Sequence, residues 1–208
     1  MKETTAKKKF MWNMAGSLCN SLSSMLLLII VNRISGESRG GFFALAYSTA
    51  QLLFSVGGFE IRPVQSTDIK NKFTFDQYFT SRMLNCIIML ICMIGYIVVN
   101  GYTGVEALTV FWILGYRMVE AVADVYSGLF QQRERIDISG KEMLMRSGIS
   151  TITFTIILWL TDNLLYAAMT LTLTSLVIML FYDLHMKKYF EPTPVHLEWR
   201  GILGIYNA

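Results

Sequence analysis

Three charged residues interrupt an apolar run at spacings that place them together. Arg117, Glu120 and Asp124 stand within Val105–Phe130 at i, i+3 and i+7, so a helix over this run carries all three on one face. A charge at bilayer depth costs roughly 2.5–3.5 kcal/mol on insertion scales. We therefore expect a polar interior at this face, as in a transport or binding path.

The pairing of these three charges has more than one interpretation. Arg117 and Glu120 have the spacing of a structural ion pair, which would leave Asp124 unmatched. Asp124 would then reach water near the cytoplasmic end of the helix, be protonated, or meet a cation. Alternatively, Glu120 and Asp124 share a proton or bind Na⁺, which would make them the ion-coupling site of a secondary transporter.

Two further apolar runs carry polar residues at helical spacing. The first run has Asn13, Ser17, Asn20 and Ser24, and the second has Tyr47, Gln51 and Ser55. Such stripes either form hydrogen bonds between membrane helices or line a hydrated cavity. Because three predicted helices share this property, we favour a common cavity lined by both stripes and by the charged face.

Composition and segment length indicate the elements that position these residues. The 208-residue chain is 53% hydrophobic with a mean hydropathy of +0.45, as is typical of an integral membrane protein. Six stretches meet or approach the roughly 20 apolar residues that a span needs: Phe10–Asn32, Gly41–Ile61, Tyr78–Val99, Val105–Phe130, Met143–Leu160 and Leu164–Tyr182. The sequence therefore predicts an all-α polytopic membrane protein, a bundle of six transmembrane helices within residues 1–190.

Lysine and arginine are divided unevenly between the two sides of this bundle. One side collects Lys2, Lys7, Lys8, Lys9, Arg62, Lys70, Lys72, Arg82, Arg133, Arg135, Lys141, Arg146, Lys187 and Lys188. The first loop on the other side has Arg33 and Arg39. Since cytoplasmic loops are rich in these residues, both termini are expected in the cytoplasm. The net charge of +3 is spread over the loops, which makes nucleic acid a poor candidate partner.

Signatures of catalysis are not found in the sequence. It has no DxD, HExxH or Walker motif, and His185 and His196 both lie near the C-terminal end. The cysteines Cys19, Cys86 and Cys92 fall in predicted spans without a CxxC pattern, where packing is the expected role. We expect no enzymatic activity, no cofactor and no bound metal.

Three motifs resemble a known family. They are Asn13-x-x-Gly16-Ser17, the first loop Asn32-Arg33-Ile34-Ser35-Gly36-Glu37-Ser38-Arg39-Gly40-Gly41-Phe42-Phe43-Ala44-Leu45-Ala46, and Gly58-x-x-x-Arg62-x-x-Gln65-x-Thr67-Asp68. These segments resemble the N-terminal part of polysaccharide (O-antigen) flippases of the Wzx type, within the multidrug/oligosaccharidyl-lipid/polysaccharide exporter superfamily. The resemblance extends over Lys8–Lys188.

The resemblance implies a function and a set of contacts. Such proteins move undecaprenyl-diphosphate-linked oligosaccharides across the plasma membrane by alternating access, for lipopolysaccharide and other cell-surface polysaccharides. By matching position, Arg39 at the outer rim and Arg62, Gln65 and Asp68 at the inner rim would meet diphosphate or sugar. Arg62 equally suits a topological anchor. A cationic cavity is expected for an anionic lipid, whereas here Arg117 is outnumbered by two acids.

Length separates the chain from the family pattern of two six-helix bundles around a central cavity. Residues 1–190 supply one bundle. Residues 191–208 form a proline-bounded tail in which Trp199, Ile202, Leu203 and Ile205 resemble the truncated start of a further element. We expect a truncated product, a fragment of a longer protein, or a half that pairs with itself or with a separate second half.

Three functions are therefore open at this stage. The first is the N-terminal half of a flippase for lipid-linked oligosaccharide. The second is an exporter of small cations from the same superfamily, coupled to H⁺ or Na⁺, which Glu120 and Asp124 would suit. The third is a membrane scaffold of polysaccharide assembly that transports nothing.

Overall fold

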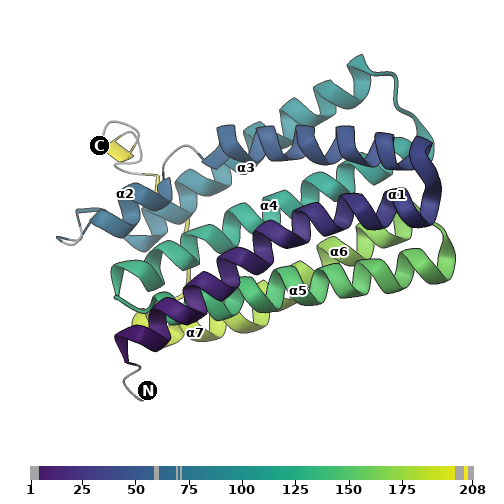
Figure 1. Ribbon diagram of the computed structural model, residues 1–208. Coiled ribbons are helices and arrows are strands. Elements are labelled where there is room, and N and C mark those ends of the chain that lie inside the picture. Colours follow the sequence, from purple (N-terminus) through teal and green to yellow (C-terminus); the bar gives the residue numbers. More distant parts are fainter. Residues whose placement is uncertain (1–4, 59–60, 69, 71, 200–203, 206–208) are drawn as a thin grey trace.

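The chain folds into a bundle of long helices, shown by a computed structural model that describes residues 5–58, 61–68, 70, 72–199, 204 and 205. The elements are α1 (Ala6–Gly58), α2 (Ile61–Thr67), α3 (Phe75–Val99), α4 (Gly104–Gln132), α5 (Ile136–Thr161), α6 (Leu164–Ile178), the π-helical turn η1 (Met179–Asp183) and α7 (Leu184–Phe190). The start of α1 and α7 lie at the same end of the bundle (Figure 1). No described residue forms a strand, so the predicted all-α architecture is confirmed.

The first element, α1, is a helical hairpin. Its backbone leaves the helical region at Gly36, where φ is 85° and ψ is 172°, a conformation that glycine adopts most readily. Across the hairpin, Tyr47 Oη donates to Ser24 Oγ at 2.9 Å, and Gly40 packs on Asn32. The loop predicted between the first two spans is thus a reversal at one glycine, and the helix continues on both sides of it.

Some of the helices in the bundle are able to span a membrane. Within the described residues, four helical segments are long and apolar enough to cross a membrane: Ala6–Ser55, Phe75–Val99, Ile136–Thr161 and Leu164–Phe190. The first contains both arms of the α1 hairpin. Helix α4 is not among them, because Arg117, Glu120 and Asp124 interrupt its apolar sequence. The chain is thus a multi-pass membrane protein, and the count of six spans stays a prediction.

The outer surface of the bundle matches this assignment. On α3, Ile87, Ile91, Ile94 and Val98 are all more than half exposed, in a row at helical spacing that faces away from the other helices. A contiguous apolar surface of this kind is unfavourable in water and suits contact with lipid chains. The inner faces instead pack into an apolar core around residues such as Phe43, which has no exposed surface.

Helices α1 and α5 approach each other with their backbones in contact. A Cβ added at Gly16 would overlap the carbonyl of Gly140, and a Cβ added at Gly140 would overlap the backbone of Trp12. Small residues commonly allow membrane helices this close an approach. The contact fixes the crossing of the first arm of α1 over the N-terminal half of α5.

The segment after α7 folds back onto the start of α3. Within residues 191–199, Glu198 accepts a hydrogen bond from Thr74 Oγ1 at 2.7 Å. Thr74 is also the N-cap of α3, where it forms a capping box. The predicted proline-bounded tail is therefore anchored to the bundle over these residues, while Ile202 and Leu203 lie outside the described part of the chain.

The glycine contact yields the first prediction. Replacing Gly140 by alanine should lower the free energy of unfolding by about 1–3 kcal/mol, because the added methyl forces the two backbones apart. Thermal unfolding of the detergent-solubilised protein measures this loss. Gly95→Ala on α3 is the matched control, since nothing lies within 4 Å of its Cβ position. Equal losses in the two variants would contradict the close contact.

Candidate functional site

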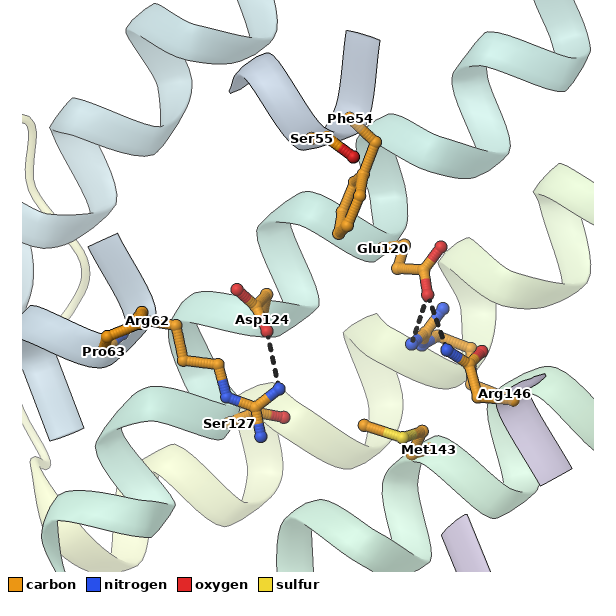
Figure 2. Close-up of a pocket in the computed structure, with 10 residues that line it drawn as sticks. Phe54, Ser55, Arg62, Pro63, Glu120, Asp124, Ser127, Met143 and Arg146 are labelled. Carbon is orange, nitrogen blue, oxygen red and sulfur yellow. Dashed lines mark hydrogen bonds and ion pairs between the residues drawn. The ribbon is translucent and has the colours of Figure 1, made fainter. Parts of the chain in front are cut away.

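A pocket with charged side chains in its wall opens within the bundle, between both arms of α1 and helices α2, α4 and α5. Its volume is about 420 Å³, and it is lined by Asn20, Phe54, Ser55, Arg62, Pro63, Glu120, Asp124, Ser127, Met143 and Arg146. Figure 2 shows Arg62 turned toward Asp124 and Arg146 turned toward Glu120. The charged face of α4 predicted from its spacing thus borders a cavity, and two arginines from other helices border it too.

Glu120 is held by groups from three helices. It forms the predicted ion pair with Arg117 on its own helix, and Arg146 Nη2 of α5 lies 3.9 Å from its Oε1 atom. Asn20 Nδ2 of α1 donates to the same oxygen at 3.0 Å. Because the side chain is only 8% exposed, these partners replace the water that an ionised carboxylate needs.

Asp124 is not left unmatched: of the three outcomes open from the sequence, the structure shows that it meets cations. Its Oδ1 accepts from Arg62 Nη1 at 2.9 Å, and its Oδ2 accepts from Arg82 Nη2 at 3.0 Å. These arginines belong to α2 and α3. A helical spacing reveals partners within one helix only, so it could not show partners that lie 62 and 42 residues away in sequence.

A third buried acid completes the charge cluster. Glu142 of α5 accepts from Arg146 Nε at 2.5 Å, and both side chains are almost fully buried. The cluster therefore holds the four cations Arg62, Arg82, Arg117 and Arg146 against the three anions Glu120, Asp124 and Glu142. The predicted acidic excess was wrong, because it counted α4 alone. In the described residues no three His, Cys, Asp or Glu side chains gather where they could hold a metal ion.

The four arginines differ in how firmly they are held. The Arg117 guanidinium lies 4.4 Å above the ring of Tyr47 in addition to its pair with Glu120. Arg82 is fully buried and is not among the residues that line the pocket. Arg62 and Arg146 line the pocket itself, and the Arg62 side chain is 29% exposed. These two are the cations that a molecule in the pocket would meet.

Two residues of the predicted polar stripes line the pocket, Asn20 and Ser55, and Asn20 donates to Glu120. Ser24 instead bonds within the hairpin to Tyr47 and to the backbone carbonyl of Asn20. Ser17 is exposed, and Asn13 is half-buried beside the contact between α1 and α5. The half-buried Gln51 precedes the pocket residue Ser55 by one helical turn, and its carbonyl accepts from the Ser55 hydroxyl.

The predicted rim residues are divided between three places. Arg62 lines the pocket, whereas Arg39 pairs with Asp162 at 3.0 Å at the opposite end of the bundle, by the α5–α6 connection. Gln65 has no exposed surface and packs against Gly128. The structure thus brings Arg62, and not the other three, together with Glu120 and Asp124.

Asp68 organises the connection between α2 and α3. It accepts from the backbone N–H groups of Lys72 and Phe73 at 2.8 and 3.0 Å and from the Tyr78 hydroxyl at 3.1 Å. Partial desolvation by itself would raise the pKa of Asp68, but these three hydrogen bonds outweigh it and hold the pKa below its usual value. This carboxylate supports the loop that follows Arg62.

Sequence reasoning missed three residues of the cluster: Glu142, which it did not consider, and Arg82 and Arg146, which it assigns to cytoplasmic loops. Arg82 and Arg146 were counted as cytoplasmic charges, yet they are 0% and 2% exposed. They therefore do not count toward the orientation of the chain. Arg146 had a local signal, since it follows Glu142 by four residues. Arg82 had none, because its partner Asp124 is on another helix.

The pairing of Asp124 yields the second prediction. Replacing Asp124 by asparagine should lower the free energy of unfolding by about 3–5 kcal/mol, because it removes the acid from the buried Arg82. Asp162→Asn is the control, since its pair with Arg39 is more than half exposed on the aspartate and should cost less than about 1 kcal/mol. Thermal unfolding of the purified variants compares them. A loss in Asp162→Asn as large as that in Asp124→Asn would contradict the account.

One known family model matches the chain over most of its length. The family model described as "Polysaccharide biosynthesis protein" matches residues 6–201, a range that contains the hairpin, the pocket and the charge cluster. Neither the curated proteins nor the solved structures contain a match to the chain. Since the matched range covers nearly all of its length, this chain belongs to the polysaccharide biosynthesis protein family.

Proposed function

We propose that the chain is one half of a transporter that moves lipid-linked oligosaccharide across the plasma membrane by alternating access. Membership of the family supports a role in polysaccharide biosynthesis, and the apolar helices support a membrane location. The observation that carries the proposal is the pocket with Arg62 and Arg146 in its wall, inside an otherwise apolar bundle. Arginines at this depth suit a ligand with an anionic headgroup and a lipid tail.

The chemistry of the pocket fits a diphosphate. A guanidinium presents its N–H groups as a planar fork that matches phosphate oxygens, and such charge-assisted hydrogen bonds are among the strongest in proteins. In this structure Asp124 accepts from an Arg62 donor at 2.9 Å, and Arg146 lies in an ion pair with Glu120 at 3.9 Å. We infer that the two carboxylates hold Arg62 and Arg146 in place until the diphosphate oxygens displace them.

The finer features of the transporter belong to the same proposal. They are six spans, both termini in the cytoplasm, and a Wzx-type mechanism with a second six-helix half or a second copy of the chain as the opposite wall. A coupling ion, H⁺ or Na⁺, would drive the cycle. The single bundle presents one wall of the pathway, so transport depends on this second wall.

Binding of the headgroup is the first test. Replacing Arg62 by alanine should weaken binding of a polyprenyl-diphosphate sugar to the purified chain in nanodiscs by about tenfold or more, because a charge-assisted hydrogen bond contributes about 1.5–3 kcal/mol. Arg133→Ala is the matched control: this arginine is 40% exposed and pairs with Glu191 away from the pocket. Arg62→Lys keeps the charge without the fork and should be intermediate. Unchanged affinity in Arg62→Ala would contradict the assignment.

Transport distinguishes the proposal from its two alternatives. In proteoliposomes, flipping of the lipid-linked sugar should fall in Arg62→Ala and persist in Arg133→Ala. Efflux of small organic cations that Glu120→Gln abolishes would instead favour an ion-coupled exporter. Binding to polysaccharide synthesis enzymes with neither flipping nor efflux would favour a scaffold.

A further inference from the structure

An unpaired acid lies buried outside the cluster described above. Asp183 is the last residue of the π-helical turn η1, where α6 passes into α7. It has no exposed surface, and neither carboxyl oxygen has a hydrogen-bond partner within the described part of the chain. Single π-helical turns inside helices occur frequently at functional sites. The turn and the unpaired acid are two independent observations at one place.

Helices α4, α5 and α7, which pack against this turn, carry the titratable and charged groups that surround Asp183. Helix α5 contributes Glu142 and Arg146, and α4 contributes Tyr126. On α7, Lys187 follows Asp183 by one helical turn, but its Nζ donates to the Thr193 carbonyl at 2.6 Å. Within the turn η1, Tyr182 directly precedes Asp183. Among these groups, only Arg146 also lines the pocket.

Arg146 is arranged to exchange partners. Its Nε donates to Glu142 at 2.5 Å and its Nη2 lies 3.9 Å from Glu120 Oε1. Its third nitrogen, Nη1, is buried and has no hydrogen-bond partner in the described residues. One guanidinium therefore joins the pocket acid Glu120 to the interior, has one unbonded donor, and interacts electrostatically with Asp183.

The burial of Asp183 determines which protonation state of its carboxyl group is stable. An ionised carboxylate without a hydrogen bond is very costly in an apolar interior, and the neighbouring Glu142 carboxylate adds repulsion between like charges. A neutral carboxyl group avoids both costs. When the proton leaves, the cation that interacts electrostatically with Asp183 is Arg146, whose Nη1 donor is unbonded.

We propose that Asp183 is a proton-binding site that controls Arg146. The protonated acid leaves Arg146 with Glu120 at the pocket; loss of the proton to water creates a carboxylate that draws the guanidinium away from the pocket. The binding of a proton by Asp183 does not depend on the proposed function. Its consequence for the ligand rests on the proposed function, since it assumes that the pocket takes an anionic headgroup.

Infrared spectroscopy tests the proton-binding step directly. The purified chain in nanodiscs should show the C=O stretch of a protonated carboxyl group at neutral pH, and Asp183→Asn should remove it. Asp137→Asn is the matched control: Asp137 is also fully buried, but Arg135 donates to both of its oxygens at 2.8 and 2.9 Å, so its ionised form is satisfied. A band that survives in Asp183→Asn would overturn the proposal.

Labelling the unmutated chain with carboxyl-¹³C aspartate keeps the test valid whatever the variants do to folding. The band should shift with the label if it belongs to an aspartate. A band that does not shift would belong to a glutamate such as Glu142 and would overturn the assignment to Asp183.

The effect on the pocket is measured as the pH dependence of headgroup binding. Affinity for a polyprenyl-diphosphate sugar should fall about tenfold or more as the pH rises and Asp183 ionises, since one charge-assisted contact is lost. Asp183→Asn should bind tightly at all pH values. The infrared band with no binding at any pH would defeat the proposed function and leave the proton site intact. Binding whose pH dependence is unchanged in Asp183→Asn would overturn control of Arg146.

Discussion

A charge inside an apolar bundle must find a partner there, and this constraint determines how the helices of this protein meet. Two acids of helix α4 have partners on three other helices. Asp124 binds Arg62 of α2 and Arg82 of α3. Glu120 pairs with Arg146 of α5. Removing a charge from water costs several kcal/mol even in real proteins, and only close pairing offsets it. The arrangement of helices that satisfies these acids is therefore also the arrangement that creates the pocket.

The same pairing gives the pocket its chemical character. Four arginines and three acids leave one positive charge in the cluster, and two of the arginines face the cavity. A further anion can thus enter without leaving the cluster strongly negative, by taking donors that the carboxylates now occupy. The surrounding surface is apolar and suits a lipid chain. These two properties together support the proposed ligand, a lipid with an anionic headgroup.

The sequence predicted the helices well because their signals are local. Apolar runs placed the elements, and the i, i+3 and i+7 spacing correctly placed Glu120 and Asp124 on one face and paired Glu120 with Arg117. Tertiary partners carry no such signal, so the sequence assigns Arg82 to a loop although its partner Asp124 lies on another helix. The reversal at Gly36 was predicted only as a loop, since glycine permits a sharp turn without requiring one.

The central claim is that Asp124 holds the place of an anionic ligand on Arg62. The most direct measurement is the affinity of a polyprenyl-diphosphate sugar for Asp124→Asn, with and without Arg62→Ala, in nanodiscs. If the carboxylate competes with the ligand, Asp124→Asn should bind more tightly than the unmodified chain, and Arg62→Ala should abolish this gain. Unchanged or weaker binding in Asp124→Asn, or a gain that persists without Arg62, would contradict the account.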